Sequence, residues 1–195
     1  MIENTRYYWG TPARVLHWLA ALLIVSLFLH GELYLEDHEK GAGAAFQLGL
    51  HASAGVTLAV ITLARLFWRV GNETPLLPAH MTPFERVAAE GVQVVLYLLT
   101  FAVILTGWAM TGSLGQEVTM RLFGLIPVPA GPADLAKPTK KLAEDAHELL
   151  AMVLIGIATM HAAAALWHHF VKGDSILRRM VIGRQRQRQR NRTPS

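Results

Sequence analysis

EDAHELLAMVLIGIATMHAAAALWHHFVKGDSILRRM occupies residues 144–180 and decides the fold, because it predicts one long apolar helix. Its central span, Leu149–Trp167, has 19 residues without Asp, Glu, Lys or Arg. At ~1.5 Å per residue this span nearly crosses a bilayer core of about 30 Å. His147 and His161 are 14 residues apart, which places them about 40° apart around the helix and about 21 Å apart along it. Ionisable side chains at membrane depth usually face the bundle interior, so this face predicts two cofactor sites stacked across the membrane.

Three further apolar blocks precede this segment, at about Pro12–Tyr34, Ala44–Trp68 and Val87–Gly112. Four such helices in up-down order hide their polar residues from lipid by forming a bundle. We therefore expect an all-α integral membrane protein, with residues 1–182 as one four-helix transmembrane domain. The remaining residues, 183–195, have the sequence GRQRQRQRNRTPS and predict a disordered basic tail.

The basic residues indicate how the bundle is oriented. The N-terminus, the second loop and the C-terminal tail carry 13 Lys and Arg residues, whereas the first and third loops carry 5. The positive-inside rule therefore places both termini in the cytoplasm. Attraction to anionic lipid explains the Arg-rich tail more simply than nucleic-acid binding does.

Depth along the helices sorts four histidines into two pairs. His17 and His161 lie towards the cytoplasmic side, and His51 and His147 lie towards the periplasmic side. Two axial imidazoles per layer suit a six-coordinate haem b, whereas zinc requires three or four ligands at one depth. Gly55, one helical turn after His51, would leave flat space beside a haem, and the lack of cysteine excludes covalent attachment. The alternative is that these histidines are hydrogen-bonded structural residues or members of a proton path.

Other polar residues at the cytoplasmic depth leave alternatives open. His168 lies seven residues after His161 on nearly the same face and competes with it as the partner of His17. Arg14 and Arg65 are candidates to bind the propionates of the inner haem through charge-assisted hydrogen bonds. Ordinary anchoring at the membrane surface explains the two arginines equally well.

The remaining histidines are expected to lie outside the two layers. His30 is at periplasmic depth but about 140° from His17 around the first helix, so we expect it to face elsewhere. His38 and His80 fall in loops and are expected at the surface.

Short motifs with paired histidine, glycine and aromatic residues follow one another along the chain: Arg14-Val-Leu-His17-Trp18, His51-Ala-Ser-Ala-Gly55, Arg65-Leu-Phe-Trp68-Arg69, Tyr97-Leu-Leu, Gly107-Trp108, Phe123-Gly-Leu-Ile-Pro127, His147-Glu148 and His161-Ala-Ala-Ala-Ala-Leu-Trp-His168-His169. In this order, the motifs resemble those of the bacterial cytochrome b561 family of four-helix, di-haem membrane proteins over roughly residues 12–180. The resemblance implies haem ligation by His17, His51, His147 and His161, and it favours His161 over His168. Gln93 replaces a histidine that some relatives have four residues before the Tyr-Leu-Leu element.

The resemblance implies electron transfer across the bacterial inner membrane and exchange with the quinone pool. His168, from its place at the cytoplasmic end of the last helix, is a candidate quinone contact. One branch is similar to superoxide:quinone oxidoreductases, which oxidise superoxide at the periplasmic face and reduce ubiquinone. Other members are membrane subunits that exchange electrons with a periplasmic redox partner, so whether this chain is an enzyme stays open. The basic residues of the third loop could steer superoxide, dock an acidic partner or only solubilise the loop; they are Arg121, Lys137, Lys140 and Lys141.

A hypothesis from another class is a transporter or proton channel that uses the same histidines without haem. It predicts a colourless protein, whereas the haem hypothesis predicts a red one.

Overall fold

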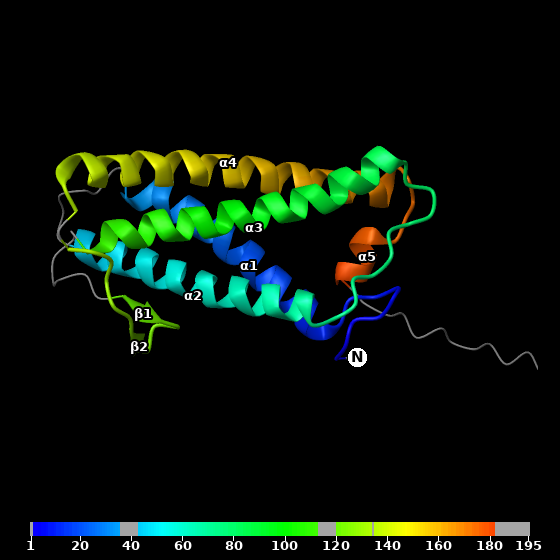
Figure 1. Ribbon diagram of the computed structural model, residues 1–195, viewed down its shortest axis with the longest axis horizontal. Coiled ribbons are helices and arrows are strands. Elements are labelled where there is room, and N and C mark those ends of the chain that lie inside the picture. Colours follow the sequence, from blue (N-terminus) through cyan, green and yellow to red (C-terminus); the bar gives the residue numbers. More distant parts are fainter. Residues whose placement is uncertain (1, 36–42, 113–119, 134, 182–195) are drawn as a thin grey trace, which may run out of the picture.

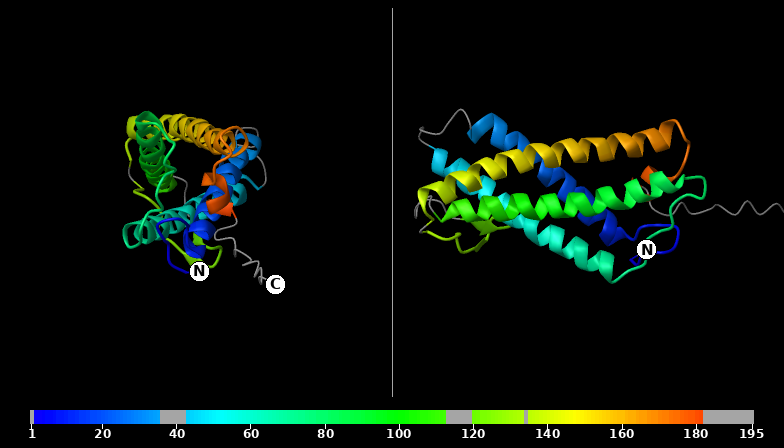
Figure 2. Two further views of the ribbon diagram at one scale, coloured as in Figure 1. Left: turned by 90° about the vertical axis from the view of Figure 1, so that its right-hand side faces the viewer. Right: turned by 45° about the horizontal axis from the view of Figure 1, so that its top comes forward.

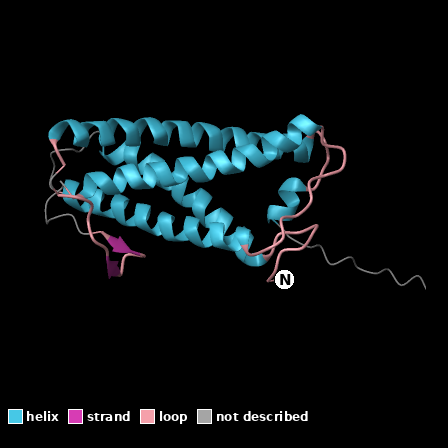
Figure 3. Ribbon diagram, in the orientation of Figure 1, coloured by secondary structure: helices cyan, strands magenta, loops and turns pink. Residues whose placement is uncertain are grey.

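The computed structural model describes residues 2–35, 43–112, 120–133 and 135–181. The basic tail predicted for residues 183–195 and the loop residue His38 lie outside the described residues. The described chain is mostly helical, with one short β-hairpin (Figure 3). Its elements are α1 (Thr11–His30), the π-helical turn η1 (Gly31–Leu35), α2 (Ala44–Val70), α3 (Pro83–Thr111), β1 (Arg121–Leu122), β2 (Ile126–Pro127), α4 (Lys137–Phe170) and α5 (Ile176–Val181).

The four long helices lie side by side in up-down order, with α1 inclined across the bundle (Figures 1 and 2). Each is long and apolar enough to cross a membrane. Their outward faces carry large exposed apolar side chains such as Leu22, Phe46, Leu98 and Met160, which suits contact with lipid rather than water. The fold is therefore the predicted all-α four-helix membrane bundle.

Local sequence explains where the helices begin. A proline occupies the first turn of α1, α3 and α4, where its missing N–H removes no helical hydrogen bond. The start of α3 also has a capping box: the Glu85 N–H donates to Thr82 Oγ1 at 3.3 Å, and the Thr82 N–H donates to Glu85 Oε2 at 2.9 Å.

The end of α4 differs from the prediction of one helix continuing to Met180. The helix stops at Phe170, and Gly173 adopts a φ of +67° in the turn that follows. The short helix α5 then folds back against α1, where the Trp18 indole N–H donates to the Met180 carbonyl at 3.2 Å. The direction of this turn depends on contacts with α1 that are distant in sequence.

The start of α4 also differs, because the helix begins at Lys137 rather than near Glu144. Lys137, Lys140 and Lys141 therefore belong to the first turns of the helix and not to a loop. Part of the preceding segment forms the β1–β2 hairpin, whose turn places Phe123 at a φ of 52° and Gly124 at a φ of 72°.

A small apolar core lies between the two ends of the bundle. Ala20 on α1 packs with Leu58 and Ile61 on α2, and all three are almost fully buried. This apolar layer falls between His51 and Arg65 along α2. It therefore separates the polar residues at the two depths.

Candidate functional sites: two stacked histidine pairs

The structure brings the four membrane-depth histidines together as two pairs. The outer pair is His51 on α2 and His147 on α4, with ring centroids 6.3 Å apart. The inner pair is His17 on α1 and His161 on α4, with ring centroids 6.4 Å apart. The ring planes of each pair are inclined at 73°. Because α4 contributes one residue to each pair, the spacing of about 14 helical residues separates the pairs by about 21 Å.

These centroid separations fit the geometry of two axial ligands. A metal bound to two opposed imidazole nitrogens at ~2.0 Å each places the centroids about 6.4 Å apart, after adding a ring radius of about 1.2 Å at each end. Rings in edge-to-face contact also have centroids about 4.5–7 Å apart, so the spacing is compatible with an iron between the rings without requiring one.

In the outer pair, His147 has the hydrogen bonding that is typical of a metal-ligand histidine. His147 Nδ1 lies 2.9 Å from the Val103 carbonyl oxygen, which can only accept, so Nδ1 is the protonated nitrogen and Nε2 is the free lone pair. The Nδ1 atoms of His17 and His51 are buried and have no hydrogen-bond partner among the described residues. Buried nitrogens of this kind normally have a partner, which fits a ligand-binding role.

Two glycines shape the space around the outer pair. A Cβ atom at Gly107 on α3 would lie 2.8 Å from His147 Cε1, so a larger residue there would have to displace the His147 ring. A Cβ atom at Gly55 on α2 would meet no heavy atom within 4 Å. Gly55 therefore opens the helix surface one turn from His51, as a flat macrocycle requires.

Arg65 is the better placed of the two predicted propionate-binding residues. Its guanidinium lies 5.2 Å from the centroid of the Tyr97 ring, and it is close enough to His17 and His161 to interact electrostatically with both. Among the described residues Arg65 makes no hydrogen bond or ion pair. A half-buried guanidinium in this position favours an anionic partner such as a carboxylate.

Arg14 has partners of its own. Its Nη1 donates to the Val181 carbonyl at 3.2 Å, and its Nη2 donates to Thr11 Oγ1 at 3.2 Å. These bonds tie the start of α1 to the end of α5, so Arg14 has a structural role independent of any propionate.

His168 lies in a different cluster from the inner pair. Its Nδ1 is 2.6 Å from Asp174 Oδ2, beyond the end of the membrane-depth face of α4. The ring next to His17 on α4 is that of His161.

The helical angle predicted that His30 faces away from the two histidine pairs, and this prediction is wrong. Its ring centroid is 5.6 Å from that of His51, and its Nε2 lies 2.9 Å from Gln47 Oε1. The angle was measured from the face of α1 that meets α4 at His17. Because α1 is inclined across the bundle, a different face meets α2 at the outer end (Figure 2). The depth that His30 shares with His51 was the only property of the sequence that could have predicted their contact.

Four apolar helices that enclose two stacked imidazole pairs are the arrangement expected of a membrane-bound b-type cytochrome. The chain matches the family described as prokaryotic cytochrome b561 over residues 8–183, and it belongs to this family. Membership in this family accounts for the fold and supports haem b as the cofactor and membrane electron transfer as the function.

Individual relatives cover nearly the whole chain. Cytochrome b561 homolog 2 of Escherichia coli is 32% identical over 181 residues, covering 91% of this chain and 93% of the relative. Cytochrome b562 of Cereibacter sphaeroides is 30% identical, covering 85% and 90%. A protein named probable superoxide oxidase CybB from Yersinia pestis is 29% identical, covering 85% and 91%.

Proposed function

We propose that the protein binds two haem b groups and carries single electrons across the bacterial inner membrane. His17 and His161 would hold the inner haem, and His51 and His147 would hold the outer haem. The observation that carries this proposal is the pair of centroid separations, 6.4 Å and 6.3 Å, at two depths of one bundle. Each bound haem supplies a one-electron carrier.

The residues around each layer perform separate tasks. The Val103 carbonyl orients His147 by accepting from its Nδ1, and Arg65 supplies a positive charge for an inner propionate. The apolar layer of Ala20, Leu58 and Ile61 excludes water between the two depths. With both termini in the cytoplasm, as the positive-inside rule predicts, His17 and His161 would hold a haem near the cytoplasmic surface, where it would exchange electrons with a quinone.

We propose superoxide as the electron donor at the outer face and ubiquinone as the acceptor. The similarity to a relative named probable superoxide oxidase supports this donor. The lysines at the start of α4 give only weak support to superoxide as the donor, because two of them have acidic partners. Lys141 pairs with Asp145 at 2.8 Å, and Lys140 pairs with Glu144 at 3.7 Å, so their charge is largely balanced.

The experiment that tests this donor is rapid mixing of haem-loaded protein with a pulse of superoxide. We expect reduction of the haems within the mixing time and reoxidation by added ubiquinone without a protein partner. Replacing Lys137, Lys140 and Lys141 by Gln would remove three positive charges and leave Glu144 and Asp145 without their partners. We therefore expect superoxide to reduce the haems of this variant more slowly, and high salt to lessen the difference from the wild type.

Failure of superoxide to reduce a fully loaded protein that quinol reduces readily would contradict this donor. The protein would then pass electrons between quinone and a periplasmic redox partner, which leaves the two haem sites as proposed.

A further inference from the structure

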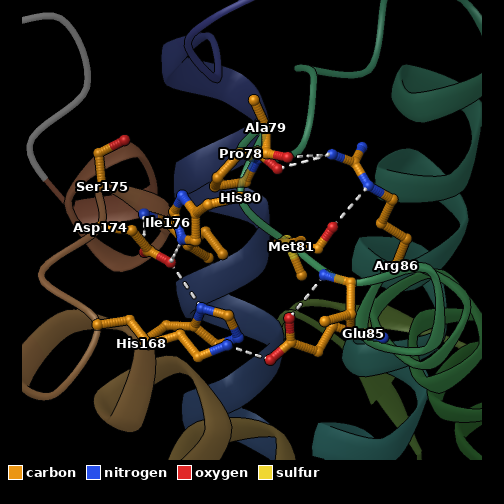
Figure 4. A network of polar contacts seen from close by, with 12 residues as sticks. Pro78, Ala79, His80, Met81, Glu85, Arg86, His168, Asp174, Ser175 and Ile176 are labelled. Atoms are coloured by element: carbon orange, nitrogen blue, oxygen red, sulfur yellow. Dashed lines mark hydrogen bonds and ion pairs between the residues drawn. The ribbon is translucent and has the colours of Figure 1, made fainter.

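Two imidazoles and one carboxylate meet at the end of the bundle that carries α5, outside both histidine pairs (Figure 4). His168 lies near the end of α4, Asp174 lies in the turn before α5, and His80 lies in the connection between α2 and α3. Asp174 Oδ2 is 2.6 Å from His168 Nδ1 and 3.5 Å from His80 Nε2. One donor atom of each residue lies within 4.8 Å of the others, although the three segments are far apart in sequence.

The carboxylate at the centre of this cluster is buried but has no fixed cation. The Asp174 side chain is 4% exposed. Its partners in the described part of the chain are the two imidazoles and the Ile176 N–H, which donates to Oδ1 at 3.0 Å. No described Lys or Arg bonds to it. A buried carboxylate is unfavourable unless a positive charge accompanies it, so the cluster favours binding of a cation.

The groups around the cluster hold its members in place. Arg86 donates from Nη2 to the Pro78 carbonyl at 2.8 Å and from Nε to the Met81 carbonyl at 3.3 Å, which fixes the loop on both sides of His80. The Ile176 N–H orients the Asp174 carboxylate in the way that outer partners orient metal ligands. The nearby Glu85 is already engaged by Lys172 and by the Thr82 N–H, so it is not a further ligand.

We propose that His80, His168 and Asp174 bind one divalent transition-metal ion, for which Zn²⁺ is the best fit. Imidazole nitrogens and a carboxylate oxygen are ordinary zinc ligands, whereas Mg²⁺ and Ca²⁺ prefer oxygen alone. Tetrahedral zinc with bonds of ~2.0–2.1 Å separates its ligand atoms by about 3.3 Å. The contact between His80 and Asp174 already has nearly this length, and the contact between His168 and Asp174 needs to lengthen by less than about 1 Å. Water fills the fourth position, and the metal ties the α2–α3 connection to the end of α4.

The test uses the haem-loaded protein in detergent, freed of any affinity tag and treated with a chelator. Titration with Zn²⁺ against a competing fluorescent chelator should reveal one strong site per chain. His80→Ala, His168→Ala and Asp174→Asn should each weaken binding at least about tenfold, since even an outer-shell partner contributes ~10- to 100-fold. Glu85→Gln is the matched control, because it changes a neighbouring carboxylate outside the ligand set and should retain the affinity.

A second readout is thermal unfolding followed by haem absorbance. Zn²⁺ should raise the melting temperature of the wild type but not of His80→Ala, because a ligand that binds only the folded state stabilises it. His80 is 51% exposed, so its replacement should leave the fold and the haem content intact even where Asp174→Asn does not.

No strong Zn²⁺ site in the wild type, or equal affinity in the wild type and His80→Ala, would overturn the proposal. The three side chains would then form only a hydrogen-bonded network. The haem spectrum recorded in the same samples reports separately on the two haem sites, so failure of one proposal does not affect the other.

Discussion

At the scale of single residues, the function depends on how each imidazole is held. His147 is oriented by a backbone carbonyl, whereas the Nδ1 atoms of His17 and His51 have no partner in the described residues. Arg65 rests on the Tyr97 ring beside the inner pair and makes no hydrogen bond to the described chain. These contacts divide the polar residues into three groups: the proposed haem ligands, Arg65 as the proposed partner of a haem propionate, and residues with structural roles.

The first residue-scale prediction concerns ligand pairing. His17→Ala and His161→Ala should each lose the same haem, and the double variant should lose no more, because one axial pair is already broken. His51→Ala and His147→Ala should behave likewise for the other haem. Haem per chain and redox titration of the remaining haem measure this. His168→Ala is the control and should retain both haems; loss of the inner haem in that variant would contradict the assignment of His161.

The second residue-scale prediction concerns Arg65. Arg65→Gln should lower the midpoint potential of the inner haem by tens of millivolts, because a nearby positive charge in a low-dielectric region favours the added electron. The outer haem should keep its potential. Arg14→Gln is the comparison and should have a smaller effect, since its guanidinium already bonds to Thr11 and Val181. Equal shifts in both variants would show that Arg65 has no special role.

At the scale of elements, α4 determines where the sites lie. Its 34 residues extend about 51 Å, well beyond the ~30 Å of a bilayer core. The surplus lies at its charged start, so His147 is near one end of the apolar part of the helix. The β1–β2 hairpin docks on α2 one turn from His51, where the Arg121 N–H donates to Ser53 Oγ and the Phe123 N–H donates to Thr57 Oγ1.

The contact between α3 and α4 at Gly107 leads to an element-scale prediction. Gly107→Ala should reduce or alter binding of the outer haem, because the new methyl group would lie 2.8 Å from His147 Cε1 and displace the ring. Gly91→Ala on the same helix is the control, since an added Cβ there meets no atom within 4 Å. The two variants have the same gain in helix propensity, so a difference in the outer haem spectrum isolates the steric effect. Identical spectra would show that the helices can separate freely at this point.

At the scale of the whole molecule, an apolar exterior surrounds two polar layers at different depths of the bundle. Apolar side chains cover its outside, and the imidazole pairs lie on the inside at two depths. Between them the core of Ala20, Leu58 and Ile61 is closely packed. This arrangement favours movement of electrons, which cross apolar protein, over movement of ions, which require continuous polar groups.

The whole-molecule prediction concerns stoichiometry. Purified protein should contain two haem b per chain, both low-spin, and acid–acetone should extract all of it because no cysteine can hold it covalently. A pyridine haemochromogen assay against protein concentration measures this. One haem per chain after expression with ample haem would contradict the two-layer arrangement.

The amino-acid sequence by itself determined the number of membrane helices, the all-α class and the depth of each histidine. These properties follow from apolar length and from position along a helix, which are local quantities. Three outcomes were decided only by tertiary structure: the contact of His30 with His51, the return of α5 onto α1, and the meeting of His80 with His168 and Asp174. Each depends on how two or three inclined segments cross or turn. The face that a helix presents at a crossing is set by its partners, so periodicity within one helix could not predict it.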